Sequence, residues 1–337
     1  MDNLDVLNTD RLVDRFGRQV TYVRLSVTDR CDFRCQYCMS EKMQFLPRQK
    51  LLTLEEMAAV GKSLSNLGVN KIRITGGEPL VRKNILWLFE KLAQLDPIKD
   101  LTLTTNGSQL SKYAKELKTA GVTRINISLD SLNEKRFNEI TRTGNLSQVL
   151  KGVDAAINAG FEKIKINSVI MKNHNHDEIH DLVSFAVDRN IDISFIEEMP
   201  LGIINSHGRD KTYYSSDEVK RDIEQHYELN TSLKQTAGPS RYYDIKDTNS
   251  SVGFISPHSH NFCENCNRVR ITAEGRLLLC LGQEHSVDLR DVMRRYPGDD
   301  AKLRSSLIHA MEIKPKSHEF DVNVEPVILR HMNMTGG

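Results

Sequence analysis

Six cysteines occur in this chain, and they fall into two groups of three. The first group, Cys31, Cys35 and Cys38, lies in one loop directly after an extended apolar run. A four-iron cluster is normally held by four thiolates, so three thiolates leave one iron open to bind a small molecule and pass it an electron. A structural zinc ion needs four ligands, and neither a histidine nor a fourth cysteine lies near this loop. The spacing therefore favours an iron–sulfur cluster.

The second group consists of Cys263, Cys266 and Cys280, a C-x-x-C pair followed by a third cysteine after thirteen residues. Taken alone, this pattern is as typical of zinc as of an iron–sulfur cluster. Three histidines are close enough in sequence to supply a fourth zinc ligand: His258, His260 and His285. If the site instead holds a second three-thiolate cluster, its open iron is free to bind substrate.

A glycine pair follows a predicted strand in the segment Gly76-Gly77-Glu78-Pro79. Two glycines let a backbone come close to a ligand, and Glu78 would accept a hydrogen bond from a ligand's ammonium group. Taken alone, the segment is also typical of a plain strand-to-helix turn.

Several cations occupy alternate positions of predicted strands, where side chains share one face. Arg268 and Arg270 are two residues apart, and four further cations lie on inward faces of earlier strands: Arg24, Lys71, Arg73 and Lys165. Cations crowded into one interior repel each other unless an anion is present. Because the arginine fork matches phosphate oxygens, a triphosphate is the expected guest. Each cation taken singly could equally be a solvated or ion-paired surface charge.

The elements that position these residues alternate regularly. Strands are predicted over 20–27, 71–75, 101–105, 124–130, 163–169 and 191–199, and helices over 54–67, 84–95, 111–120, 134–140, 146–159 and 177–188. Thr53, followed by Glu56, is typical of a capping box at the first helix. Strict alternation with short connections predicts a parallel sheet. One face of nearly every strand is polar, which favours an incomplete barrel around a polar ligand over an open doubly wound sheet.

The alternation stops near residue 201, and two domains are predicted, 1–215 and 216–337. In the second part we expect a loop over 201–213, a helix over 215–227, a mostly extended region over 229–262, and helices over 286–295 and 300–313.

Composition excludes some classes of protein. The net charge of the 337 residues is +1, which does not indicate a broad nucleic-acid-binding face. No apolar run reaches the roughly 18 residues of a spanning helix, and the first residues lack the apolar core of a signal peptide. We therefore expect a cytoplasmic protein with no membrane or nucleic-acid partner, whose cysteines are ligands rather than disulfides.

The first cysteine loop resembles the signature of radical S-adenosylmethionine (SAM) enzymes, in which Tyr37 stands directly before the third cysteine. The segment 76–79 matches the methionine-binding segment of those enzymes. Together the motifs are similar to those of one such family, the GTP 3′,8-cyclases of molybdenum cofactor biosynthesis. The further motifs are 104–107, 126–132, 195–199, 263–270, Cys280 and the terminal Gly336-Gly337.

The resemblance implies an α/β fold, an incomplete (β/α)6 TIM-like radical SAM barrel with a smaller C-terminal α+β region that carries the second iron–sulfur cluster. It implies a lyase that cyclises GTP to (8S)-3′,8-cyclo-7,8-dihydroguanosine 5′-triphosphate, after a 5′-deoxyadenosyl radical has taken hydrogen from C3′ of GTP. The implied cofactors are SAM and two 4Fe–4S clusters, each held by three cysteines.

The resemblance also implies roles for individual residues. Contacts to SAM fall to Tyr37, Gly77, Ser128 and Met199. Contacts to GTP fall to Arg24, Arg73, Thr104, Lys165, Arg268, Val269 and Arg270. The tail glycines Gly336 and Gly337 would assist the cyclisation, and Lys71 and Glu78 are further candidates for the site.

The implied partners are the substrate GTP and an external electron donor. The cyclic pyranopterin monophosphate synthase acts downstream, and no direct contact with it is implied. A homodimer is also a candidate. Two alternatives remain. One is a peptide-modifying radical SAM enzyme with an auxiliary cluster, although a peptide needs no triphosphate clamp. The other is a non-enzymatic zinc protein that binds nucleic acid, although the charge balance opposes it.

Overall fold

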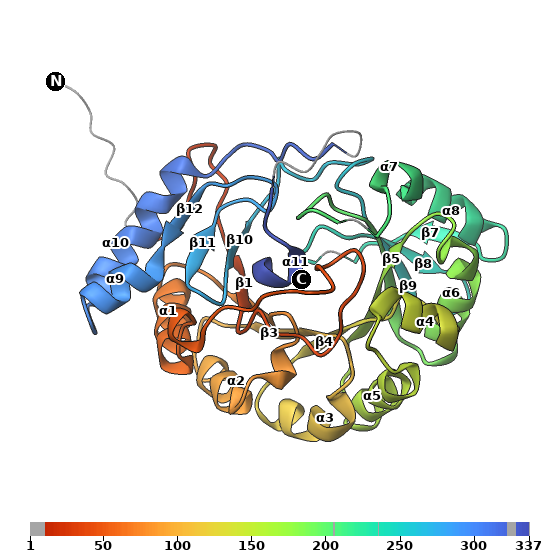
Figure 1. Ribbon diagram of the computed structural model, residues 1–337, viewed down its shortest axis with the longest axis horizontal. Helices are drawn as coiled ribbons and strands as arrows, with labels where there is room; N and C mark the ends of the chain where they lie inside the picture. The colour runs from red at the N-terminus through yellow and green to blue at the C-terminus, as the bar shows by residue number, and fades with distance from the viewer. Residues whose placement is uncertain (1–10, 205, 235, 322–327, 337) are drawn as a thin grey trace.

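A computed structural model describes residues 11–204, 206–234, 236–321 and 328–336 (Figure 1). Its first half consists of six strands alternating with helices. The strands are β1 (Tyr22–Ser26), β2 (Lys71–Thr75), β3 (Asp100–Thr105), β4 (Arg124–Ser128), β5 (Ile164–Ile170) and β6 (Asp192–Glu197). The helices are α1 (Leu54–Asn66), α2 (Ile85–Ala93), α3 (Leu110–Thr119), α4 (Glu134–Thr141), α5 (Leu146–Asn158) and α6 (Ile179–Asp188). All six predicted strands are confirmed.

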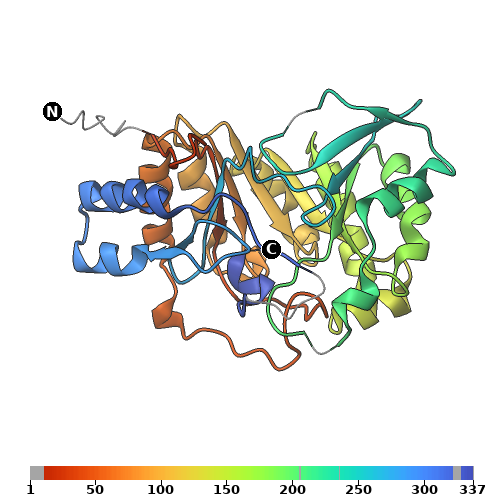
Figure 2. The same ribbon diagram turned by 90° about the horizontal axis from the view of Figure 1, so that it is seen from above.

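The six strands pair in chain order, and every pair is parallel. Figures 1 and 2 show the sheet curving around a central space, with α1–α6 on its outer side. Within the described residues, the strand order runs β12-β11-β10-β1-β2-β3-β4-β5-β6-β9-β8-β7 and does not close. The predicted incomplete barrel is therefore confirmed.

The later part of the chain extends the same sheet at both ends. Its elements are α7 (Arg209–Thr212), α8 (Ser216–Glu224), β7 (Leu229–Thr231), β8 (Arg241–Ile245), β9 (Ser251–Ile255), β10 (Arg268–Ile271), β11 (Arg276–Leu278), β12 (Ser286–Asp288), α9 (Leu289–Arg295), α10 (Asp300–Ala310) and α11 (Met332–Thr335). Strand β10 pairs parallel with β1, and β9 pairs parallel with β6. Two hairpin-like extensions, β11–β12 and β8–β7, then continue the sheet in antiparallel fashion.

Two predictions for this part were wrong in detail. The predicted helix over 286–295 begins with strand β12, because Val287 pairs with Leu277 of β11 before Asp288 caps α9. The predicted loop over 201–213 contains the single turn α7.

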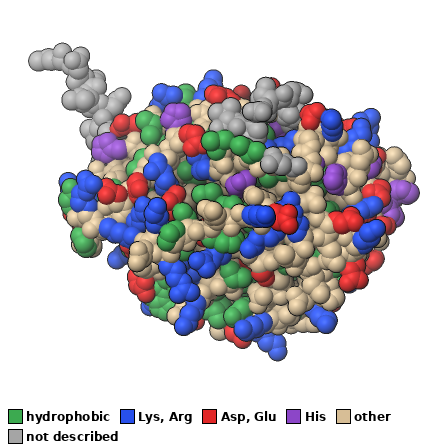
Figure 3. Space-filling model, viewed as in Figure 1, with side chains coloured by type: hydrophobic (Ala, Val, Ile, Leu, Met, Phe, Trp, Pro, Cys, Tyr) green, Lys and Arg blue, Asp and Glu red, His purple; other side chains and the backbone are tan. Residues whose placement is uncertain are grey.

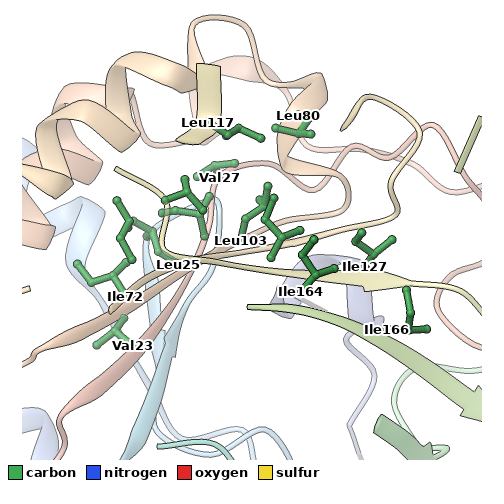
Figure 4. Packing of buried hydrophobic residues seen from close by; sticks show 14 of the residues in the cluster. Val23, Leu25, Val27, Ile72, Leu80, Leu103, Leu117, Ile127, Ile164 and Ile166 are labelled. Atoms are coloured by element: carbon green, nitrogen blue, oxygen red, sulfur yellow. The ribbon is translucent and has the colours of Figure 1, made fainter. Parts of the chain in front are cut away.

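Alternation along the strands decides which side chains fill the core. Val23, Leu25, Ile72, Leu103 and Ile127 point to the outer face, where they pack under the helices (Figure 4). The polar residues between them must then point inward. At the start of α1 the predicted capping box is confirmed, since Thr53 and Glu56 exchange backbone-to-side-chain hydrogen bonds of 3.1 and 2.8 Å.

Candidate active site

One large cavity lies inside the curved sheet, and both cysteine groups line it. Cys31, Cys35 and Cys38 approach it from the loop after β1. Cys263, Cys266 and Cys280 approach it from the segments that flank β10 and β11. The fold therefore brings the two groups to a single site, although more than two hundred residues separate them in sequence.

The first cysteine loop is held by backbone bonds to the end of α4. Arg34 and Gln36 donate their backbone N–H groups to the carbonyls of Thr141 and Ile140, both at 2.9 Å. Arg142 returns a side-chain bond of 2.9 Å to the carbonyl of Arg34. These bonds hold the middle of the loop, so the three thiols are positioned by the neighbouring βα unit as well as by their own sequence.

The chemistry of these thiols fits a bound cationic cluster. Burial raises the pKa of Cys31 and Cys35 well above the usual thiol value, and it raises the pKa of Cys38 to about 12. Buried thiolates are costly without a positive partner, and a metal centre supplies one. Asn106 adds an N–H···S contact of 3.8 Å to the Cys31 sulfur, which is the kind of support that cluster ligands receive.

The glycine pair after β2 lies directly against the chain that leads into the cysteine loop. An added Cβ at Gly77 would lie 2.3 Å from the carbonyl oxygen of Arg30, and one at Gly76 would lie 2.8 Å from that of Thr28. The Gly77 N–H also donates to the Thr28 carbonyl at 2.7 Å. The sequence predicts that these glycines let a ligand come close. They also let the backbone of residues 28–30 come close, and both line the cavity.

Glu78 is placed differently from the expectation that it receives a ligand's ammonium. Its carboxylate is fully buried and accepts bonds from the Leu80 N–H, the Thr105 hydroxyl and the Asn106 N–H, at 3.0, 2.8 and 2.7 Å. Burial, only partly offset by these donors, raises the pKa of Glu78 to about 7. The side chain thus fastens the end of β3 to the turn after β2.

The four residues predicted to contact SAM all line the cavity: Tyr37, Gly77, Ser128 and Met199. The Tyr37 hydroxyl donates to Asp130 at 2.7 Å, and burial raises the pKa of Asp130 to about 6. Asp130 also accepts the Val169 N–H at 2.8 Å, so the phenol is fixed to the ends of β4 and β5.

The second cysteine group has a buried lysine beside it. Lys314, only 1% exposed, donates to the Leu279 carbonyl at 2.9 Å and contacts the Cys266 sulfur at 3.7 Å. Burial alone would raise the pKa of Cys266, but the positive charges of Lys314 and Arg268 outweigh it and lower that pKa. Arg18 braces the same region, donating to the Cys263 carbonyl at 2.8 Å.

The histidines considered as zinc ligands do not line this cavity. The His258 ring contacts the Glu198 carbonyl at 2.9 Å, and the His260 ring pairs with Asp217.

The predicted cations meet in two rows across three neighbouring strands. Tyr22 of β1 lies in register with Arg268 of β10 and Lys71 of β2. Two residues further on, Arg24 lies in register with Arg270 and Arg73. Partners in a parallel sheet point to the same side, so all of these side chains face the cavity, as does Lys165 from β5.

These interior cations have neutral partners. Arg73 donates to the hydroxyls of Tyr22 and Thr104, at 2.7 and 3.0 Å, while Lys165 donates to the Tyr242 hydroxyl at 2.9 Å. Lys71 forms an ion pair with Asp100. Within the described part of the chain, the other five cations form no ion pair: Arg24, Arg73, Lys165, Arg268 and Arg270. On the face shown in Figure 3, by contrast, Lys and Arg are interspersed with Asp and Glu.

The crowding of these cations lowers the pKa values of two of the arginines. Burial, together with the charges of Arg73 and Arg268, lowers the pKa of Arg24 to about 10. Burial and the charges of Arg24 and Arg268 lower the pKa of Arg270 well below its usual value. A polyanion in the cavity would reverse this penalty.

Helix α11 lies inside the curve of the sheet, as Figures 1 and 2 show. The Gly336 carbonyl accepts bonds from Arg24 at 3.2 Å and from Arg270 at 3.0 Å. Asn333 anchors α11 by donating to the Asp29 carbonyl at 2.9 Å. Gly337 lies outside the described residues.

The residues predicted to contact GTP, including Thr104, also line the cavity. Val269 lines it as well, although its side chain packs in the hydrophobic core. Sequence reasoning missed other lining residues. Five of them carry buried polar atoms without a hydrogen-bond partner: Thr75 Oγ1, Arg124 Nε, Asn126 Oδ1, Asn167 Oδ1 and His318 Nε2. Buried polar groups are normally paired, so these atoms fit a polar ligand. Strand alternation carried a signal for Arg124, which lies two residues before Asn126.

Comparisons with known proteins agree with this geometry. The family model for the radical SAM superfamily matches residues 25–186, and the model for the molybdenum cofactor synthesis C region matches 191–320. The GTP 3′,8-cyclase of Saccharophagus degradans is 60% identical over 331 residues, covering 98% of this chain and 100% of the relative. The GTP 3′,8-cyclase of Ectopseudomonas mendocina is 57% identical, with the same coverage.

Among solved structures, Streptococcus suis SuiB bound to the precursor peptide SuiA superposes with a TM-score of 0.62. The match covers 95% of this chain and 77% of that one, at 18% sequence identity. This likeness shows the shared fold.

Proposed function

Because this chain belongs to the GTP 3′,8-cyclase family of radical SAM enzymes, we propose that it cyclises GTP to (8S)-3′,8-cyclo-7,8-dihydroguanosine 5′-triphosphate, the first step of molybdenum cofactor biosynthesis. Full-length relatives that are 57–60% identical support this activity over the alternatives. The single structural observation that carries it is the cavity itself. Five cations without a carboxylate partner among the described residues face a space lined by two groups of three cysteines.

The chain is a radical SAM enzyme that uses SAM and an iron–sulfur cluster. We propose that Cys31, Cys35 and Cys38 hold this cluster, since their half-buried thiols share one loop on the cavity wall. When bound, the cluster and SAM supply a carbon-centred radical that can remove the hydrogen at C3′ of GTP. Tyr37, Gly77, Ser128 and Met199 are proposed to hold SAM, and the rigid attachment of Tyr37 to Asp130 supports its role in positioning.

A second 4Fe–4S cluster is proposed at Cys263, Cys266 and Cys280. All three line the substrate cavity, and the charges of Lys314 and Arg268 favour the thiolate form at Cys266. The three cysteines would leave one iron position for a donor atom of the purine. The residues present therefore fit a cluster that orients the guanine base.

The triphosphate of GTP is proposed to bind over the two cation rows. Arg24, Arg73, Arg268 and Arg270 present guanidinium groups from three adjacent strands, and Lys165 closes the far side from β5. Charge-assisted bonds from such forks fix both position and orientation. Thr104, Val269 and Lys71 line the same region, whereas Glu78 acts on the surrounding backbone.

The tail is proposed to assist cyclisation from inside the site. Its Gly336 carbonyl already accepts hydrogen bonds from Arg24 and Arg270, so a bound phosphate and the tail must share these two guanidinium groups. The tail therefore helps to exclude water from the cavity when substrate is present.

Several further predictions concern partners and location. GTP is the proposed substrate, an external donor supplies electrons, and the product passes to cyclic pyranopterin monophosphate synthase. A homodimer, a cytoplasmic location, the absence of nucleic-acid partners and the domain division at residue 215 remain predictions. Within the described residues, no helix is both long enough and apolar enough to cross a bilayer.

The test is anaerobic. The protein is reconstituted with iron and sulfide and supplied with SAM, a reductant and GTP, after which 5′-deoxyadenosine and the cyclised nucleotide are measured. We expect GTP-dependent 5′-deoxyadenosine and about eight irons per chain, the content of two four-iron clusters. Failure of GTP to stimulate 5′-deoxyadenosine would refute the activity, and one to two zinc ions in place of iron would favour the zinc alternative.

A further inference from the structure

Two tyrosine hydroxyls each accept a hydrogen bond from a cation of the cavity. Tyr22 of β1 accepts a 2.7 Å hydrogen bond from Arg73 Nε, and Tyr242 of β8 accepts a 2.9 Å bond from Lys165 Nζ. Both tyrosines are buried, with exposures of 2% and 7%, and both line the cavity. Each tyrosine therefore bonds to a cation of the proposed triphosphate site and also faces the cavity in which the ligand would bind.

The path of Tyr242 to Lys165 is opened by a glycine. Tyr242 lies in register with Gly253 of β9, which in turn lies in register with Ser194 of β6. A Cβ at Gly253 would lie 3.0 Å from the Tyr242 ring and 2.4 Å from the Ser194 hydroxyl. Without a side chain at 253, the phenol crosses two strands to reach the lysine on β5.

A phenol serves an anion site better than a carboxylate would. A carboxylate beside Arg73 or Lys165 would neutralise the cation and repel phosphate. A phenol accepts the cation's hydrogen bond through its oxygen, keeps the net positive charge, and still has its own proton to donate. Both Arg73 and Lys165 are partnered by a phenol rather than a carboxylate, as a site for phosphate requires.

We propose that Tyr22 and Tyr242 position Arg73 and Lys165 for the triphosphate of the substrate and donate their hydroxyl protons to its oxygens. This inference rests on the proposed function and extends it to two residues that the sequence reasoning did not select.

The surroundings of Tyr22 give the proposal a pH signature. Burial alone would raise its pKa, but Arg73 and Lys71 from β2, Arg268 from β10 and Arg24 from its own strand lower it to about 7. Above that pH the ligand-free site holds a phenolate, which repels phosphate and has no proton to donate. GTP binding must then be coupled to uptake of one proton. Affinity should fall as pH rises above about 7, by up to tenfold per pH unit.

The test measures GTP binding to the reconstituted protein by anaerobic calorimetry, without SAM or reductant, at several pH values from about 6.5 to 9, a window set around the Tyr22 pKa. Tyr22→Phe and Tyr242→Phe are compared with wild type. Tyr243→Phe is the matched control, because that ring packs against Phe254 and does not line the cavity. Each test variant should bind GTP roughly tenfold more weakly at neutral pH, as loss of one hydrogen bond to a charged group implies, while the control binds like wild type.

The pH profile separates a role at phosphate from a merely structural one. Wild type and Tyr243→Phe should lose affinity with rising pH, and Tyr22→Phe should lose the part of this slope that Tyr22 causes. GTP's own titration is common to all four proteins and cancels in the comparison. In turnover, the Phe variants should raise KM for GTP more than they lower kcat.

Two results would overturn the inference. Wild-type affinity and pH slope in both Phe variants would remove the tyrosines from the phosphate site while leaving the proposed function intact. Failure of the wild-type protein itself to bind GTP would instead refute both the proposed function and this inference. If one Phe variant fails to fold, the other still decides the matter, because Tyr22 and Tyr242 lie on different strands.

Discussion

The substitution Arg270→Met should have opposite effects on substrate binding and on protein stability. Arg270 is 9% exposed and shares its row with Arg24 and Arg73. In the absence of an anion its charge is repelled by its neighbours, whereas a bound triphosphate turns the same charge into an attraction. Met has a similar length and no charge, so it removes the electrostatic terms while largely keeping the packing.

The magnitudes follow from the geometry. Strands in a sheet lie about 4.8 Å apart, and two unit charges about 5 Å apart repel by about 3 kcal/mol at an effective dielectric constant near 20. Long side chains can diverge, so this is an upper limit on the repulsion relieved at Arg24. Against it stands the lost 3.0 Å bond to the Gly336 carbonyl, worth about 1.5–3 kcal/mol for a charged donor. Relief of the burial penalty on this charge, and of its repulsion by Arg268, adds to the first term. The free energy of unfolding should therefore change little or increase.

GTP binding should weaken clearly. Loss of one charge-assisted bond costs about 1.5–3 kcal/mol, which is about a 10- to 150-fold higher Kd. The assays are calorimetric titration with GTP and thermal unfolding without it, both under anaerobic conditions. Arg276→Met is the matched control, because Arg276 lies on the adjacent β11 but bonds to Ser286 and does not line the cavity. A variant that loses stability yet binds GTP within twofold of wild type would contradict the reasoning.

Three other substitutions test separate parts of the site. Cys280→Ala should lower iron from about eight to about four per chain and abolish cyclised product while sparing SAM cleavage; full product formation would exclude a substrate-side cluster. Gly77→Ala should destabilise the protein by about 1–3 kcal/mol in thermal or denaturant unfolding, because its Cβ would lie 2.3 Å from the Arg30 carbonyl. Gly238→Ala, whose Cβ would meet nothing closer than 3.4 Å, is the control, and equal losses would refute the argument. Burial raises the pKa of Glu78 to about 7, so its protonated form favours the folded state; that contribution is fully present below about pH 4.5 and is lost as pH rises through about 7. Glu78→Gln should flatten this decline in unfolding measurements, and an unchanged pH dependence would show that Glu78 does not titrate in this range.

Local patterns predicted much of the fold because they depend on neighbours along the chain. Alternation of apolar and polar residues placed Val23 and Leu25 under the helices and Arg24 inside, and the Thr53–Glu56 pair marked the start of α1. The same patterns failed at residues 286–288, where pairing with β11 overrides a helical periodicity. They gave no sign that Gly77 also lies against the backbone of residues 29 and 30.

The sequence by itself determined the chemistry available to this protein: two groups of three cysteines, inward-facing cations and a family resemblance strong enough to suggest the reaction. Only the tertiary structure decided how these groups meet. β10 pairs on one edge with its sequence neighbour β11 and on the other with the distant β1, and this second register sets Arg268 and Arg270 beside Tyr22 and Arg24. Tyr242 reaches Lys165 across β9 and β6, where Gly253 has no side chain to block the phenol. Such contacts depend on long-range packing and register, which no local spacing of residues encodes.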